Sequence, residues 1–210
     1  MKKYDDILAS VTDAYGTDEP VLTSDIEALF PDIPRRTLFS QIAALVDSGR
    51  LERYESGVYY VPSETLAGRS TLNPVKVIRR KYLGSEEDPC GYWAGATLDN
   101  GIGLTEQVPA RYEVVTNNTG TAQRTVKVGG FLECVVRRAK VPVDAGNVRA
   151  QQVLDVLTRR SPSTLTDGQA EALCAFAAPV PAKELYRMSM AWPQKTTRHV
   201  LEGEISGVLT

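Results

Sequence analysis

The side chains best suited to chemistry in this chain are polar groups on one side of a predicted helix over residues 34–48. They are Arg35, Arg36, Thr37, Ser40 and Gln41. Arg can bind guanine through two hydrogen bonds, and Gln can bind adenine in the same way. Ser and Thr hydroxyls bind backbone phosphates. Because no acidic residue interrupts this side before Asp47, the pattern predicts a surface that reads duplex DNA.

A second basic group follows that helix, around a tight turn at Glu55, Ser56 and Gly57. Two short runs of alternating polarity flank the turn, which predicts a two-stranded wing. Arg50 and Arg53 bring positive charge to this wing. We therefore expect it to approach the DNA backbone beside the helix.

The most basic segment of the chain is a predicted helix over residues 74–83, capped by Asn73. Its cations are Lys76, Arg79, Arg80 and Lys81. Such a helix commonly presents a solvated charged face, and this is the simpler interpretation. The alternative is a second set of phosphate contacts beside the winged region.

The residues typical of catalysis are sparse and isolated. His199 has no Cys, His or acidic cluster near it in the sequence, which argues against a zinc site or a histidine-based triad. Gly101 and Gly103 lack the Lys and Ser or Thr of a phosphate-binding loop. Glu133 is a single acidic residue on a predicted strand. We therefore expect no enzyme activity, no cofactor and no metal.

The elements that must position the DNA-reading residues occupy residues 1–63. Apolar residues at helical spacing, from Tyr4 through Ile7, Leu8 and Val11 to Tyr15, predict a first helix. A second, short helix is expected after Ser24, with Glu27 completing a capping box. Three helices followed by a wing make a winged helix-turn-helix, which presents its third helix to the DNA major groove.

The remaining residues, 64–210, predict a second, mixed α+β domain. We expect helices over residues 74–83, 92–98, 147–157, 166–178 and 184–190, with residues 192–210 unassigned. Strands over residues 111–116 and 124–128 are joined by Asn-Asn-Thr-Gly-Thr, which has the chemistry of a hairpin turn. A third strand is expected over residues 131–138. The predicted fold class is therefore α+β.

Composition is ordinary for a globular protein, but its charge is uneven. Residues 1–63 carry 6 Lys and Arg against 11 Asp and Glu, an unfavourable balance for a DNA-binding domain. The three cysteines are far apart and form no metal or disulfide pattern. No secretion signal or membrane-spanning run is recognised, so we expect a cytoplasmic protein.

The chain resembles the AbiEi family of antitoxins and related transcriptional regulators over roughly residues 1–160. The resemblance rests on the Gly-Val-Tyr-Tyr-Val-Pro that ends the wing and on Gly-Leu-Thr-Glu-Gln-Val-Pro at residues 103–109. Gln152, Leu154 and Asp155 also fit. The family implies DNA reading by the predicted helix and a wing over residues 53–59, which adds Ser56 and Tyr59 to the contacts.

The resemblance also implies a function for each domain. The first would repress the protein's own promoter, and the second would counter a nucleotidyltransferase-like toxin in a type IV system, without requiring direct contact with it. One alternative is a transcriptional regulator whose second domain binds a ligand or partner. Another is an interaction module whose winged helix contacts protein.

Overall fold

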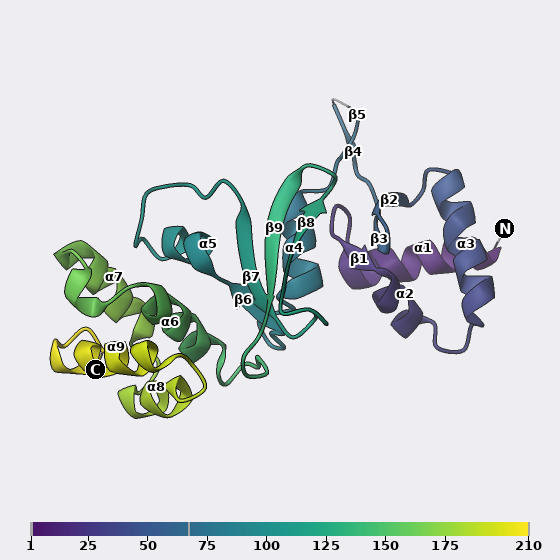
Figure 1. The fold of residues 1–210 in the computed structure, drawn as a ribbon. Helices are drawn as coiled ribbons and strands as arrows, with labels where there is room; N and C mark the ends of the chain where they lie inside the picture. Colours follow the sequence, from purple (N-terminus) through teal and green to yellow (C-terminus); the bar gives the residue numbers. More distant parts are fainter. Residues whose placement is uncertain (1, 67, 210) are drawn as a thin grey trace. The chain divides into compact units, whose positions relative to one another are not determined.

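The computed structural model describes residues 2–66 and 68–209, and it is a mixed α+β protein (Figure 1). Contacts divide the chain into two units. Unit 1 is Met1–Lys81 with Val128–Phe131, and unit 2 is Tyr82–Lys127 with Leu132–Thr210. This division lies later in the chain than the expected boundary after residue 63.

Unit 1 begins with three helices and three short strands. They are α1 (Lys2–Tyr15), β1 (Val21–Leu22), α2 (Thr23–Leu29), α3 (Arg35–Asp47), β2 (Glu52–Glu55) and β3 (Val58–Tyr60). The expected apolar face of the first helix is confirmed at Ile7 and Val11, which are buried with Ile26 and Leu45. The side chain of Tyr4, expected on the same face, lies outside the described residues.

Strand β3 is the central strand of the first sheet, whose order is β1-β3-β2. Both pairings are antiparallel, with Val21 opposite Tyr59 and Arg53 also opposite Tyr59. The strand β1 was not expected, because two residues give no alternation to detect.

The expected capping box of Ser24 and Glu27 is wrong. Helix α2 begins two residues earlier, at Thr23, with Leu22 as its N-cap, and the Asp25 carboxylate accepts a hydrogen bond from the Leu22 N–H at 2.8 Å. This satisfies one of the N–H groups that a helix start leaves unpaired. Glu27 takes no part in this cap and binds Arg35 instead.

Three further elements follow in unit 1, and the last of them ends at Tyr82, the first residue of unit 2. They are β4 (Glu64–Thr65), β5 (Gly68–Arg69) and α4 (Pro74–Tyr82). Strands β4 and β5 form a hairpin where a polar connection was expected. At its base, the Ser63 and Ser70 hydroxyls donate to the Asp18 carboxylate, and these hydrogen bonds lower the pKa of Asp18. Helix α4 confirms the expected helix, with Asn73 Oδ1 accepting from the Val75 N–H.

Unit 2 contains a four-stranded sheet in the order β6-β7-β9-β8. Its strands are β6 (Gly91–Trp93), β7 (Tyr112–Thr116), β8 (Gln123–Val128) and β9 (Leu132–Arg138). The expected hairpin between β7 and β8 is wrong, because β9 lies between them and pairs parallel with β7. The tight turn instead joins β8 to β9 at Gly129 and Gly130. Both glycines have positive φ, as a type I′ turn requires.

Helices and a short 3-10 turn complete unit 2. They are α5 (Gly95–Gly101), α6 (Val148–Arg159), η1 (Pro162–Thr164), α7 (Asp167–Ala177), α8 (Ala182–Ser189) and α9 (Gln194–Ile205). The helix expected over residues 92–98 is right only from Gly95, where α5 begins, because Tyr92 and Trp93 belong to strand β6. Helix α6 is the best buried, with Val153, Leu154 and Leu157 inaccessible to solvent. It lies in a helical core to which α5, α7, α8 and α9 also contribute.

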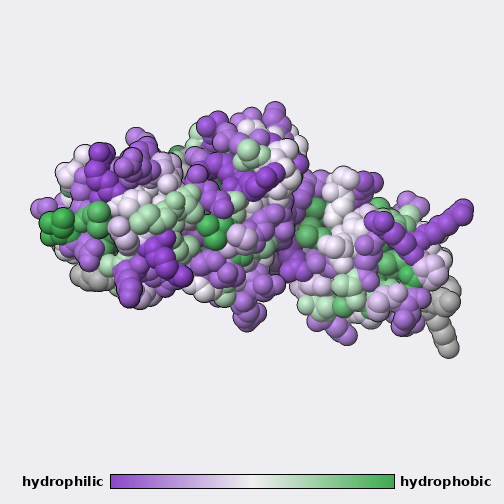
Figure 2. Space-filling model, turned by 60° about the horizontal axis from the view of Figure 1, so that its bottom comes forward, coloured by the Kyte–Doolittle hydropathy of each residue, from purple (hydrophilic) through white to green (hydrophobic). Residues whose placement is uncertain are grey.

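The surface is mainly hydrophilic on the face seen in Figure 2, with smaller hydrophobic groups between the polar ones. Large apolar side chains that are well exposed include Leu66, Val108 and Phe131, which lie in three separate connections, and Ile205 at the end of α9. Among the described residues, no helix combines the length and apolar character needed to cross a membrane.

Candidate nucleic-acid interface

The first two turns of α3 present three of the expected DNA-reading side chains to solvent. Arg36, Thr37 and Ser40 are all exposed, and Pro34 precedes the helix as its N-cap. The buried side of the helix carries Leu38 and Ile42. The N-terminal half of α3 therefore offers one full positive charge and two hydroxyls, with no carboxylate on the helix before Asp47.

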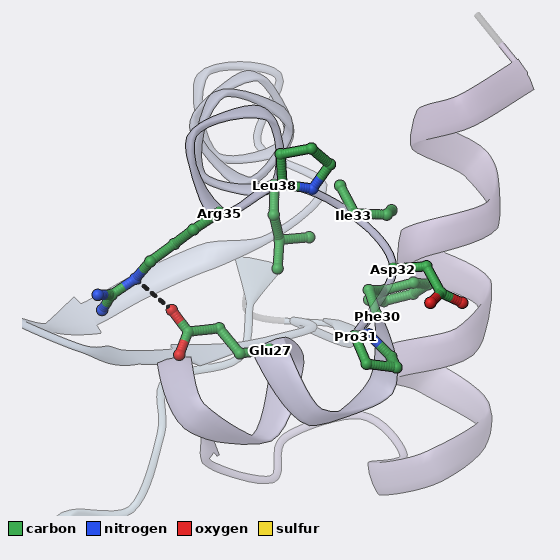
Figure 3. A pocket seen from close by; sticks show the side chains of 8 residues that line it. Glu27, Phe30, Pro31, Asp32, Ile33, Arg35 and Leu38 are labelled. Atoms are coloured by element: carbon green, nitrogen blue, oxygen red, sulfur yellow. Dashed lines mark hydrogen bonds and ion pairs between the residues drawn. The ribbon is translucent and has the colours of Figure 1, made fainter.

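Arg35 is exposed but already has an acidic partner. Its Nε donates to Glu27 Oε1 at 2.7 Å, and its guanidinium lies 5.3 Å from the centre of the Phe39 ring. Figure 3 shows this pair beside a cavity of about 430 Å³ at the turn between α2 and α3. Arg35 is mostly exposed and Glu27 partly so, and the attraction within such a pair is weak.

Gln41 is a correction to the expected set. Its side chain is buried, and its Oε1 has no hydrogen-bond partner among the described residues. The physical reason is its position along the helix, because Gln41 follows Leu38 by three residues and precedes Leu45 by four. Those are the spacings of the core face, so Gln41 cannot read a base from this conformation.

The two strands expected around the turn at residues 55–57 are paired, but only part of the surface expected for a wing is exposed. Arg53 and Ser56 are exposed, and Arg50 is half-buried. Tyr59 is buried in the core of unit 1, which corrects its assignment as a DNA contact. Tyr59 and Val61, two residues apart, both belong to that core, so alternation along the chain places Tyr59 on the inner face of the sheet.

The basic residues of α4 are largely used inside unit 1. Lys76 binds Glu19, Arg80 binds Asp25 at 2.9 Å, and Lys81 binds Glu55 at 2.7 Å. Arg79 is exposed. These ion pairs are a third use of the helix, different from both the solvated face and the phosphate contacts that the sequence suggested.

The ion pairs also explain the acidic balance of residues 1–63. Unit 1 as a whole carries 11 Lys and Arg against 12 Asp and Glu, so it is close to neutral. The carboxylates of Glu19, Asp25 and Glu55 are neutralised by α4. The cations of α3 and the wing are therefore opposed by less negative charge than the sequence of residues 1–63 implies.

One cation near this region was missed by the sequence analysis. Arg69, on β5, binds Glu52 of the wing at 3.1 Å and Glu64 at 3.4 Å. Its guanidinium also lies against Gly49, where a Cβ would come within 2.6 Å of Nη1. No local pattern marked Arg69, because its partners become neighbours only through the hairpin.

Groups suited to catalysis are used structurally. The His199 ring is buried, and its Nδ1 lies 2.6 Å from the Leu157 carbonyl oxygen, which joins α9 to α6. Burial raises the pKa of the Cys134 thiol to about 12, so it stays protonated. Within residues 2–66 and 68–209, no group of three His, Cys, Asp or Glu side chains could hold a metal ion.

Comparisons with known proteins add little to this geometry. No protein-family model matches the chain, and no curated protein matches it. Among solved structures, the crystal structure of the RV2827C protein from Mycobacterium tuberculosis is similar, with a TM-score of 0.46 and 14% identity. The similarity covers 92% of this chain and 73% of that chain. It is too low to support an argument about function.

Proposed function

We propose that the first unit is a winged helix-turn-helix that binds duplex DNA, with the N-terminal half of α3 in the major groove. The observation that carries this proposal is the exposed, acid-free surface of Arg36, Thr37 and Ser40. Arg53 and Ser56 of the wing would contact the adjacent backbone. Phosphate contacts position such a domain, and the helix side chains provide sequence preference.

The whole protein, in this proposal, is a cytoplasmic, non-enzymatic antitoxin that represses its own promoter. Its second unit would counter a nucleotidyltransferase-like toxin without needing stable contact. This part is supported by the motif at residues 103–109 and by the resemblance it carries. Leu104 of that motif is fully buried, and its carbonyl accepts from Gln169 at 2.8 Å, so the motif anchors a loop to α7.

A second candidate function is a regulator whose second unit binds a small ligand and has no antitoxin role. It is favoured by a cavity of about 350 Å³ inside unit 2, next to the end of β9. Ligand pockets in proteins commonly have this size.

One experiment tests both parts of the leading proposal. Cells carry a reporter under the protein's own promoter together with the adjacent gene, and they express the wild type or the double variant Arg36→Ala, Ser40→Ala. We expect the variant to bind its promoter about tenfold more weakly, since it loses one base-reading and one hydroxyl contact. It should lose repression and still protect growth.

The matched control is the double variant Arg187→Ala, Arg198→Ala, which removes two exposed cations of unit 2. It should keep both repression and protection. Full repression by the α3 variant, when it is folded, would remove α3 from the DNA interface. A harmless neighbouring gene, or toxicity that persists beside folded protein, would exclude the antitoxin role and favour the ligand-binding regulator.

A further inference from the structure

We infer that the cavity of unit 2 is a binding site for a small phosphate-bearing anion. The cavity measures about 350 Å³ and lies at the ends of strands β7 and β9. Residues that line it include Tyr92, Val115, Arg137, Arg138, Lys140 and Asp155. This site is independent of the proposed DNA-binding function, because it lies wholly within unit 2.

The sheet places the central lining residues in one row. Tyr92 of β6 is opposite Val115 of β7, and Val115 is opposite Arg137 of β9. Residues in register on adjacent strands point to the same face of a sheet, so these three side chains lie together. Helix α6 adds Asp155 to this face, and Arg137 Nη2 donates to its Oδ1 at 3.1 Å.

Asp155 supplies the carboxylate that lines the cavity, and both of its oxygens already accept hydrogen bonds. Asp155 Oδ2 accepts from the Gly95 N–H at 3.0 Å and from Arg159 at 3.2 Å, while Oδ1 accepts from Arg137. It therefore has little capacity left to neutralise the other two cations. Arg138 and Lys140 are exposed at the cavity. Glu113 is a second carboxylate nearby, with its Oε2 4.0 Å from Arg137 Nη2. Arg137 and Arg159 offset Asp155 and Glu113, so Arg138 and Lys140 leave an excess of about two positive charges for a ligand.

Arg137 also has an unused donor. Its Nε is buried and has no hydrogen-bond partner within the described residues, although Nη2 is occupied by Asp155. Buried donors are nearly always paired in folded proteins, by protein, water or ligand. Because Nε is closed to solvent in this conformation, an oxyanion in the cavity would reach this N–H only after the Arg137 side chain turns.

The chemistry of the lining favours phosphate over a simple carboxylate. A phosphate group carries up to two negative charges on tetrahedral oxygens, which suits cations that approach from different residues. Burial raises the pKa of the Tyr92 phenol, so Tyr92 stays a neutral side chain and adds no negative charge. Trp192 is largely buried and contributes apolar lining.

The test measures binding of pyrophosphate, inorganic phosphate, ATP and citrate to the full chain by titration calorimetry at constant ionic strength. The pocket variant is Arg138→Gln with Lys140→Gln. The control is Arg124→Gln with Lys127→Gln, which removes the same charge from exposed positions of β8 outside the cavity. A third variant, Arg137→Lys, keeps the charge and removes the forked guanidinium.

We expect wild-type protein to bind pyrophosphate and the pocket variant to bind it at least about tenfold more weakly. The control should change the affinity by less than about twofold, and Arg137→Lys should weaken binding despite its unchanged charge. ATP that binds more tightly than pyrophosphate would identify a nucleotide, whereas equal affinities would identify the phosphate groups alone as the ligand.

Two results would overturn the assignment. The first is no saturable binding of pyrophosphate or ATP by the folded wild type, or an equal loss in the pocket and control variants. The second is citrate binding as tightly as pyrophosphate, which would show an unselective anion surface. Failure here leaves promoter repression through α3 unaffected, so the two proposals fail separately.

Discussion

Gln41 shows how one residue can fit a functional pattern and serve the fold instead. Its amide is suited to reading adenine, and its neighbour Ser40 is exposed on the same helix. The spacing to Leu38 and Leu45 nevertheless places Gln41 on the buried side. Residue type alone suggested the wrong role, and helical phase was the signal that could have corrected it.

Replacing Gln41 by Met should stabilise unit 1 by about 1 kcal/mol, because it removes a buried carbonyl oxygen that has no donor and keeps the side chain's length. Urea denaturation measures this change in unfolding free energy, and promoter binding should stay the same. Ser40→Met is the matched control on the adjacent exposed position, where no gain in stability is expected. Weaker DNA binding by folded Gln41→Met would mean that the side chain turns outward on DNA.

At the scale of elements, α4 illustrates what sequence could not provide. Its length and cap were predictable from Asn73 and the apolar spacing, and the structure confirms both. The acidic partners of α4 could not be predicted. Asp25 lies 55 residues from Arg80, and Glu55 lies 26 residues from Lys81. A run of basic residues carries no information about which carboxylates the fold will bring near it.

The ion pair between Arg80 and Asp25 should also support α2. Asp25 caps that helix, and the Arg80 guanidinium lies 5.2 Å from the centre of the Tyr15 ring. We therefore expect Arg80→Met to destabilise this region by about 1 kcal/mol, since the pair is only partly exposed. Hydrogen exchange should accelerate in peptides that cover α1 and α2.

Arg79→Met is the control for this element, because Arg79 is exposed on the same helix and surface ion pairs contribute little. Exchange that accelerates equally in both variants would show that α4 supports unit 1 by its apolar side alone. Acceleration confined to α4 would show that Arg80 does not reach α2 in solution.

The sheet of unit 2 shows a different limit of sequence reasoning. Strands β7, β8 and β9 were predicted close to their observed positions, yet their order was wrong. Residues 117–121 have turn chemistry, but Gly129 and Gly130 make the tight hairpin turn. Because β9 then pairs parallel with β7, the ends that carry Thr116 and Arg138 come together. The cationic cavity follows from this order and could not be predicted from the strands alone.

At the scale of the whole molecule, net charge limits how the proposed DNA complex can form. The chain has a formal net charge of −2, and unit 1 is almost neutral once α4 is included. Long-range attraction to DNA is therefore small. In the proposed complex, specific binding depends on a few cations, chiefly Arg36 and Arg53, while Arg35 is paired with Glu27.

This arrangement predicts a shallow salt dependence of promoter affinity. Each neutralised phosphate contributes about 0.9 to the slope of log K against log salt, so two to four contacts give a slope of about −2 to −4 per bound copy. Fluorescence anisotropy between about 50 and 200 mM salt measures it.

Arg53→Gln should reduce the slope by about one, because Arg53 is exposed on the wing. Lys76→Gln should leave it unchanged, because Lys76 binds Glu19 within unit 1. A slope steeper than about −6, together with a loss of about one on Lys76→Gln, would instead place the cations of α4 on the DNA backbone.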